Sequence, residues 1–369
     1  MNIALVHEFL VTWGGSDLVA RTFCDIYPGA PLYTALYDPA VMDKHFAGVD
    51  VRVSSLNKYP LALKKHRLYM PMFPLVFEQF DLRGYDIVLS SHHMAAKGVL
   101  TSADTCHVCF VHTPMRYAWD FYHEYIEEFN PLLRPVARRL LHHLRIWDVA
   151  AANRVDFFIS NAHNVARRIR KHYRRDSTVI HSPIDAQRFH IANKVGDYYL
   201  AVSRLVPYKR TDLAVQAFTK LGEKLVVAGS GPEMKRLKAM AGPNIEFLGF
   251  VPDADLPALY AGCRAFVFPA NEDFGLTPLE AQAAGRPVIA YGAGGALETV
   301  VPGRTGVFFP EQTPDSLEQA VKALDWQAFD PQEVRRHALQ FDVSVFKKKI
   351  ANFIEEKFAR WKEEAKPRS

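Results

Sequence analysis

Short apolar runs alternate with longer segments of helical periodicity along most of the chain. In the first half, the runs with the length and composition of buried strands are 3–7, 32–37, 87–90, 107–112, 157–160 and 179–181. In the second half they are 199–203, 225–228, 245–248, 265–269 and 288–291, separated by helical segments such as 211–221, 232–241 and 255–263. This alternation predicts α/β domains with parallel sheets.

The length of the chain favours two domains. A single core usually stops growing at about 250–300 residues, and the sequence has 369. Strand signals pause near 186–196, so we predict one Rossmann-like domain over 1–190 and a second over 191–345. Over 346–369 an apolar stripe predicts a helix that packs back on the first domain; it consists of Phe346, Ile350, Phe353, Ile354, Phe358 and Trp361.

Composition narrows the class of protein. With 49% hydrophobic and 23% charged residues, the chain matches an ordinary globular protein. The apolar run at the N-terminus is too short for a signal peptide, and no apolar stretch approaches the roughly 20 residues of a membrane-spanning helix. We expect a cytoplasmic protein that lies on a membrane if it meets one, and we expect no nucleic acid as partner.

The strongest candidate site is the segment 272–280, Glu-Asp-Phe-Gly-Leu-Thr-Pro-Leu-Glu, which follows the strand 265–269. Ligands of open parallel sheets bind at the carboxyl ends of strands. Backbone N–H groups suited to an anion such as a diphosphate belong to Phe274, Gly275 and Leu276, and we place Thr277 in the same donor-binding segment. A structural alternative is a capping box, in which Thr277 caps the helix and Glu280 lies three residues later.

Two cations and two glycines follow other strands of the second domain. Arg204 and Lys209 could stabilise negative charge on a departing phosphate group, or could belong to a solvated basic loop. Gly229 and Gly231 suit close approach of a ligand, or simply a tight turn.

In the first domain a glycine pair, Gly14 and Gly15, opens a helix after the first strand. It lacks the G-x-G-x-x-G spacing of dinucleotide-binding domains, which weighs against an NAD-dependent oxidoreductase.

Together these segments resemble the retaining glycosyltransferase family GT4, whose GT-B fold consists of two Rossmann-like domains that face each other across a cleft. The resemblance extends over essentially the whole chain. It implies that Glu272 lies near the hydroxyls of the donor sugar and Glu280 near the ribose. It also implies that Arg204 and Lys209 hold the diphosphate, and that the stretch containing Phe250 and Val251 contacts the nucleobase.

For the first domain, the resemblance implies that Gly14 and Gly15 face the donor phosphates. It also implies that His112, in Phe-Val-His-Thr-Pro-Met-Arg-Tyr-Ala-Trp-Asp, contacts the sugar. Without the resemblance, a histidine after a buried strand is more often a satisfied hydrogen-bonding residue. The expected catalytic set is therefore Arg204, Lys209, Glu272 and His112.

We accordingly expect transfer of a hexosyl unit, with retention, from a nucleotide sugar to a glycan or lipid-linked acceptor, without a metal ion or other cofactor. The segment around His112 is similar to mannosyltransferases of surface-polysaccharide assembly, such as that of lipopolysaccharide, which favours GDP-mannose over a UDP-sugar. Asp253-Ala-Asp255 resembles a metal-binding D-x-D motif, but its place at a helix start favours an N-cap. A non-catalytic glycan- or membrane-binding protein is a further alternative.

The segment 134–175 is strongly basic, with eleven Lys and Arg residues against Asp148 and Asp156. On a helix over 135–151, apolar positions gather on one side beside a basic strip; the apolar ones are Val136, Leu140, Leu141, Leu144 and Trp147, and the basic ones Arg138, His142 and Arg145. We expect 134–147, together with the basic and apolar stretch 58–80, to meet an anionic membrane surface on the inner face of the cytoplasmic membrane. A core helix with a solvated basic edge is the alternative.

Overall fold

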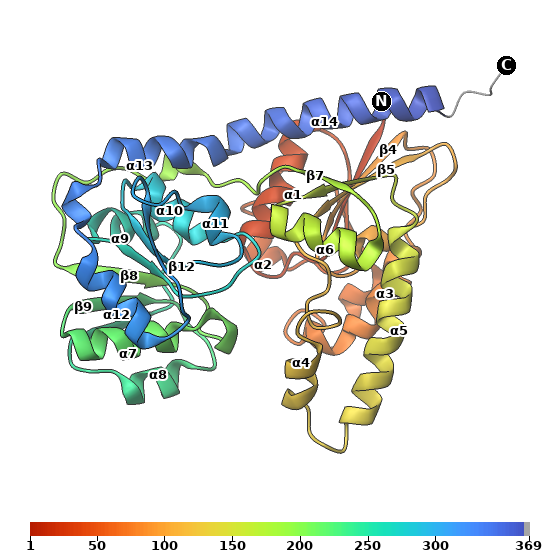
Figure 1. The fold of residues 1–369 in the computed structure, drawn as a ribbon. Coiled ribbons are helices and arrows are strands. Elements are labelled where there is room, and N and C mark those ends of the chain that lie inside the picture. The colour runs from red at the N-terminus through yellow and green to blue at the C-terminus, as the bar shows by residue number, and fades with distance from the viewer. Residues whose placement is uncertain (365–369) are drawn as a thin grey trace. The chain divides into compact units, whose positions relative to one another are not determined.

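The computed structural model describes residues 1–364 as two units, each built on one parallel sheet (Figure 1). The first unit comprises 1–181 and 346–364, and the second comprises 182–345. The sequence analysis predicted the boundary between the two domains between residues 190 and 191. The two parallel-sheet α/β domains confirm the predicted fold class.

The sheet of the first unit has seven strands in the order β3-β2-β1-β4-β5-β6-β7, all parallel. The strands are β1 (Ile3–His7), β2 (Leu32–Thr34), β3 (Val51–Val53), β4 (Ile87–His92), β5 (Cys106–Val111), β6 (Phe157–Ser160) and β7 (Ser177–Val179). The chain moves from β1 to one side and then crosses to β4 on the other, so the order reverses at β1. All residues of β1, β4 and β5 are buried, as expected for strands with both faces covered.

Helices cover this sheet. They are α1 (Gly15–Ile26), α2 (Pro39–Met42), α3 (Phe73–Glu78), α4 (Tyr122–Glu128), α5 (Arg134–Ala152) and α6 (His163–Tyr173), with short 3-10 turns η1 (Ser55–Lys58), η2 (His66–Met72) and η3 (Ala96–Gly98). The last helix, α14 (Val343–Glu364), buries the predicted apolar stripe in the core of this unit, where Phe346 stacks on Phe23 with ring centroids 6.1 Å apart.

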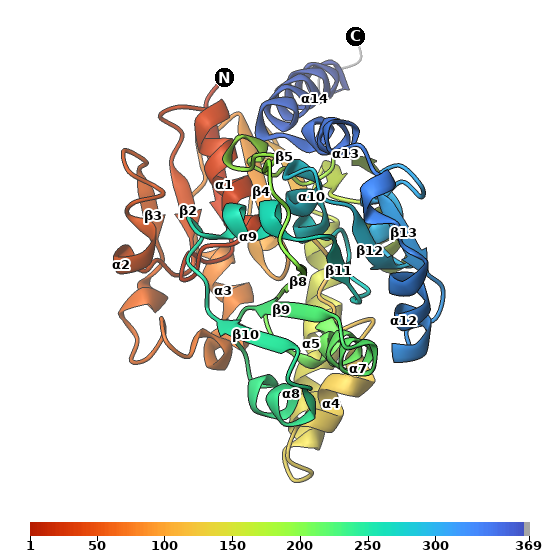
Figure 2. The ribbon, with the colours of Figure 1, turned by 90° about the vertical axis from the view of Figure 1, so that its left-hand side faces the viewer.

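The sheet of the second unit has six parallel strands in the order β10-β9-β8-β11-β12-β13. They are β8 (Tyr198–Val202), β9 (Lys224–Ala228), β10 (Ile245–Gly249), β11 (Phe266–Phe268), β12 (Val288–Tyr291) and β13 (Gly306–Phe309). Figure 2 shows β9 beside β10. This order has the same reversal as the first sheet, here at β8.

The helices of the second unit are α7 (Thr211–Leu221), α8 (Met234–Met240), α9 (Leu256–Gly262), α10 (Leu276–Ala283), α11 (Ala296–Thr299), α12 (Pro314–Ala323) and α13 (Pro331–Ala338). The 3-10 turns are η4 (Ala186–Arg188), η5 (Pro207–Lys209), η6 (Trp326–Ala328) and η7 (Leu339–Phe341). Among the described residues no helix is long and apolar enough to cross a membrane.

Candidate functional site

In the second unit, three of the predicted site residues gather at the point where the strand order reverses. Arg204 and Lys209 follow β8, and Glu272 follows its neighbour β11. Lys209 Nζ forms a short ion pair with Glu272 Oε1, and both side chains are less than one-fifth exposed. Arg204 Nη2 donates to the Tyr208 hydroxyl at 3.0 Å, and the Lys209 ammonium lies 5.5 Å from the centre of the Tyr208 ring. Tyr208, which the sequence analysis did not single out, therefore links the two cations.

Gly229 and Gly231 form a turn that packs tightly against the segment after β8. Gly229 has φ +130°, and a Cβ atom there would lie 1.9 Å from the Ser203 carbonyl oxygen. A Cβ on Gly231 would lie 2.2 Å from the carbonyl oxygen of Leu205. Both glycines are thus required by the packing of the loop that carries Arg204.

The structure does not contain the capping box that was the structural alternative for the start of α10. The N-cap residue is Gly275, with φ +87° and no side-chain cap, and Thr277 lies inside the first turn. The carboxylate of Glu280 instead accepts a 2.7 Å hydrogen bond from the Tyr260 hydroxyl. Burial raises the pKa of Glu280. Because the partner comes from α9, this interaction has no local signature in the sequence.

A second glycine turn, 292–295, was missed. The Gly295 N–H donates to the Glu272 carbonyl at 2.9 Å, and a Cβ on Gly295 would lie 2.2 Å from the Cα of Phe274. The turn therefore fixes the backbone that carries Glu272, Phe274 and the start of α10 at Leu276. The signal was available, since Gly-Ala-Gly-Gly directly follows the strand β12.

Phe250 and Val251 directly follow the edge strand β10, which lies two strands from β8. Phe250 is 78% exposed, so its ring is accessible for stacking. In the neighbouring segment, Asp255 takes the N-cap position of α9 without a side-chain hydrogen bond, and Asp253 pairs with Arg188 at 2.8 Å.

In the first unit, His112 follows β5 and its Nε2 lies 2.8 Å from the Ser91 hydroxyl on β4. That hydroxyl lies 3.0 Å from His7 Nδ1 at the end of β1, and His7 Nε2 lies 3.1 Å from Asp17 Oδ1. Burial lowers the pKa of His112 well below its ordinary value, so its ring is neutral at neutral pH. His7, Asp17 and Ser91 were missed, although the strand-end histidines His7 and His112 were visible in the sequence.

Gly14 and Gly15 begin α1, the helix that supplies Asp17. Gly14 is the N-cap residue with an extended backbone (φ −165°), and Gly15 is the first helical residue. The start of α1 is therefore placed beside the carboxyl end of β1, with Asp17 in its first turn, where the helix dipole favours a carboxylate.

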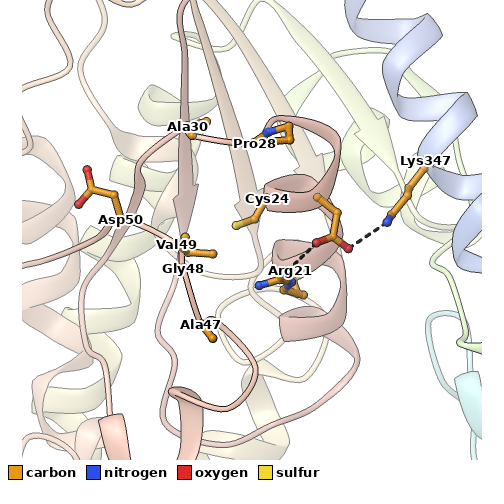
Figure 3. A pocket seen from close by; sticks show the side chains of 11 residues that line it. Arg21, Cys24, Pro28, Ala30, Ala47, Gly48, Val49, Asp50 and Lys347 are labelled. Atoms are coloured by element: carbon orange, nitrogen blue, oxygen red, sulfur yellow. Dashed lines mark hydrogen bonds and ion pairs between the residues drawn. The ribbon is translucent and has the colours of Figure 1, made fainter.

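A hollow of roughly 500 Å³ lies near the opposite end of α1 (Figure 3). Its charged lining includes Arg21 and Lys347, and both pair with the carboxylate of Asp25, at 2.8 and 2.9 Å. We interpret it as part of the seam along which α14 packs on α1.

The apolar side predicted for α5 is divided in the structure. Leu141 and Leu144 are buried in the core, whereas Val136 is 67% exposed. Arg145 is not part of a free basic strip, because its guanidinium donates to the Ala118 carbonyl at 3.0 Å and lies over the Tyr122 ring. The exposed apolar residues of this region include Leu132, Leu133, Val136, Leu140 and Ile146 on or before α5, and Leu61, Leu68, Met72 and Leu75 in the stretch 58–80.

Comparison with known families gives two consecutive matches. Residues 24–188 match the family described as Glycosyltransferase Family 4, and residues 184–326 match the family described as Glycosyl transferases group 1.

Individual relatives match parts of the chain. The GDP-mannose-dependent alpha-(1-6)-phosphatidylinositol monomannoside mannosyltransferase of Mycobacterium tuberculosis is 35% identical over 143 residues, which is 34% of this chain and only 37% of that protein. The D-rhamnosyltransferase WbpZ of Pseudomonas aeruginosa is 28% identical over 221 residues, 56% of this chain and 57% of that protein. The crystal structure of Anabaena HepE in complex with UDP and glucose has a TM-score of 0.71 at 19% identity and covers 96% of this chain and 99% of its own. This likeness confirms the predicted GT-B fold.

Proposed function

Since the chain belongs to glycosyltransferase family 4, we propose that it transfers a hexosyl unit from a nucleotide sugar to a glycan or lipid-linked acceptor, with retention and without a metal ion. The observation that carries the proposal is the ion pair between Lys209 and Glu272, beside Arg204, where the strand order of the second sheet reverses. Open α/β sheets bind ligands at this point, and fixed cations there stabilise a departing diphosphate.

The charges of the site are balanced before the donor arrives. Lys209 and Glu272 satisfy each other at a partly buried position, which avoids the cost of an unpaired charge. When a nucleotide sugar binds, Lys209 and Arg204 turn to the diphosphate and Glu272 accepts hydrogen bonds from sugar hydroxyls. Glu280 accepts from the ribose, the backbone N–H groups at the start of α10 face the phosphates, and Phe250 meets the base.

We propose GDP-mannose as the donor. The mycobacterial relative is named as GDP-mannose-dependent, and it has the higher identity of the two relatives described above. The Anabaena structure contains UDP, but at 19% identity it indicates only the fold, so UDP-glucose serves as the competing probe.

Calorimetric titration tests the donor site. The protein is titrated with GDP-mannose, UDP-glucose and NADH in the presence of a metal chelator, and the best ligand is repeated on Lys209→Ala. We expect GDP-mannose to bind and the variant to lose about 10- to 100-fold in affinity, the effect of a charge-assisted hydrogen bond. The matched control is Lys220→Ala, which removes an exposed pair with Asp315 in the same unit and should leave affinity unchanged.

Other outcomes contradict specific parts of the proposal. If UDP-glucose binds and GDP-mannose does not, the proposed donor is wrong and the proposed glycosyltransferase activity stands. If binding needs a divalent cation, the proposal of a metal-independent reaction is wrong. If NADH alone binds, the proposed transferase activity is wrong.

We further propose that the exposed apolar residues before and along the first turns of α5 meet an anionic membrane surface. Leu132 is 87% exposed and Val136 is 67% exposed, and the exposed Arg138 and Arg139 lie next to them. Such a surface inserts shallowly while its cations meet lipid phosphates.

Co-sedimentation with phosphatidylglycerol vesicles tests this proposal. We expect the wild type to pellet with the vesicles and the double variant Arg138→Glu/Arg139→Glu to stay in the supernatant. The control Lys235→Glu/Lys238→Glu on α8 should pellet like the wild type, and unchanged pelleting of the first variant removes this idea.

A further inference from the structure

We propose that Asp17, His7 and Ser91 form a positioning relay that fixes the proton of His112 on Nε2 and so presents its Nδ1 as a hydrogen-bond acceptor to a ligand hydroxyl. The ligand in this statement rests on the proposed function, together with the contact between His112 and the donor sugar that the family resemblance implies. The arrangement of protons along the relay does not, because it is a property of the ligand-free protein.

The relay is a continuous chain of three contacts. Asp17 Oδ1 lies 3.1 Å from His7 Nε2, His7 Nδ1 lies 3.0 Å from the Ser91 hydroxyl, and that hydroxyl lies 2.8 Å from His112 Nε2. The side chains of His7 and Ser91 are fully buried and that of Asp17 is almost so. Buried polar groups must satisfy one another, so each contact constrains the next.

The strands hold the relay in place. His7 and Ser91 are register partners in the parallel pair β1 and β4, and the His112 N–H donates to the carbonyl of His92 at 2.8 Å. Asp17 is fixed by the first turn of α1. The relay lies on or directly after β1, β4 and β5, which are neighbours where the strand order of the first sheet reverses. Open parallel sheets bind their ligands at this position.

The direction of the protons follows from the acceptor at the end. A carboxylate can only accept, so His7 Nε2 carries a proton toward Asp17, and the proposed relay places no second proton on His7 Nδ1. His7 Nδ1 then has a lone pair and accepts the Ser91 O–H. With its proton committed to His7, the Ser91 oxygen can only accept from His112, which places the His112 proton on Nε2.

The neighbours of His112 favour its neutral form. Burial lowers its pKa, as do the nearby imidazoles of His93 and His7. The carboxylate of Glu8 acts in the opposite direction, but it is occupied by four backbone N–H groups of 93–96. A neutral ring has one donor and one acceptor, and which side is the acceptor is decided by the relay.

Histidine-selective nitrogen-15 spectroscopy of the ligand-free protein tests the relay directly. In both His112 and His7 we expect the one-bond coupling between nitrogen and proton to appear on Nε2, which shows that this nitrogen carries the proton. In Ser91→Ala, His112 should no longer hold its proton selectively on Nε2. The matched control is Ser90→Ala, one residue earlier on the same strand: its hydroxyl bonds His107 Nε2 at 2.8 Å, so His107 should change and His112 should not.

Replacement of Asp17, the acceptor at the end of the relay, tests whether its carboxylate sets the proton positions of both His7 and His112. In Asp17→Ala, His7 is no longer held with its proton on Nε2, and we expect the signals of His7 and His112 to change together. A wild-type His112 that carries its proton on Nδ1, or a His112 signal unchanged in Ser91→Ala, overturns the relay. So does a change of His7 alone in Asp17→Ala.

Kinetics separate the relay from the proposed function. With GDP-mannose as donor, we expect Ser91→Ala to lower the transfer rate about tenfold, the effect of one misdirected hydrogen bond, while the dissociation constant of GDP is unchanged. If no nucleotide sugar binds but the wild-type and variant spectra are as expected, the proposed function fails and the relay stands. An unchanged transfer rate in Ser91→Ala overturns the role of His112 Nδ1 toward the donor.

Discussion

The hydroxyl of Tyr260 on α9 donates a 2.7 Å hydrogen bond to the carboxylate of Glu280 on α10. Tyr260 is fully buried. Burial raises the pKa of Glu280, and the hydrogen bond from Tyr260 acts against that rise. Tyr260 therefore helps to keep an acceptor carboxylate at the position proposed to hold the ribose.

Replacement of Tyr260 by Phe should raise the pKa of Glu280 further, because it removes the hydrogen bond that opposes the effect of burial. A protonated Glu280 is a poorer acceptor, so donor binding should weaken as the pH falls, and it should begin to weaken at a higher pH in Tyr260→Phe than in the wild type. We expect about three- to tenfold weaker binding of GDP-mannose at low pH, measured by calorimetry between pH 5 and 8.

Tyr198→Phe is the matched control for that experiment. Its hydroxyl donates at 2.8 Å to the Leu259 carbonyl, also on α9, and not to a carboxylate. Its loss should leave the pH dependence of donor binding as in the wild type. Identical pH profiles for Tyr260→Phe and the wild type would contradict the role given to Tyr260.

The first unit should be sensitive to the loss of one partner of a buried ion pair. Lys97 pairs with Asp148 by a short contact, and neither side chain is exposed. The indole of Trp119 and the hydroxyl of Tyr173 also donate to Asp148, at 2.8 and 3.2 Å. We expect Lys97→Met to lower the free energy of unfolding by about 3–5 kcal/mol, because it leaves a buried carboxylate without its cation.

Chemical denaturation followed by tryptophan fluorescence measures this loss, since Trp119 and Trp147 contact the pair. Lys97→Met/Asp148→Asn should be less destabilised than Lys97→Met, because no buried charge is left unpaired. Lys220→Met, which removes an exposed pair, should not shift the midpoint. A Lys97→Met midpoint equal to that of Lys220→Met would rule out this account.

Glu8 should make the stability of the first unit depend on pH. Burial alone would raise its pKa, but the contact with His92, the nearby imidazoles of His93 and His92 and backbone N–H bonds lower it well below the ordinary 4.5. A lowered pKa stabilises the folded state above pH 4.5, and this contribution is lost as the pH falls below it.

The test compares the free energy of unfolding of the wild type and Glu8→Gln from pH 7 to pH 3. We expect the variant to be less stable by about 2–3 kcal/mol near neutral pH, and the difference to shrink below pH 4.5. A difference that stays constant down to pH 3 would show that Glu8 contributes by packing and not by its charge.

The strands of the two sheets could be predicted because most are continuous buried runs. β1, β6 and β12 have the bounds expected from the sequence. The edge strands β3 and β13 were missed, since β3 is short and largely exposed and β13 begins at a glycine.

The candidate site was predictable only as separate segments. Each motif could be placed at a strand end, but the contact of Lys209 with Glu272 depends on β8 and β11 being neighbours, and alternation does not specify strand order. The same holds for Ser91 and His7, which are 84 residues apart. On α5, Leu140 and Leu141 are equally apolar in the sequence, and only tertiary packing decides that Leu141 is buried and Leu140 exposed.

The turn at Gly229 yields a prediction that joins stability to donor binding. Alanine there would have to take φ +130° and would place its Cβ 1.9 Å from the Ser203 carbonyl oxygen, directly before Arg204. Gly222→Ala is the matched control, because its φ is +74° and nothing lies within 4 Å of the added atom. It should cost about 1 kcal/mol of unfolding free energy and leave affinity for GDP-mannose unchanged.

Gly229→Ala should cost more than Gly222→Ala, because the collision with Ser203 adds to the backbone strain, and it should weaken GDP-mannose binding at least about tenfold through the displaced Arg204. Denaturant midpoints and calorimetric titrations of the two variants measure both effects. If the variants lose equal stability and bind the donor equally well, the turn does not position Arg204, and the cation is held by its contact with Tyr208 alone.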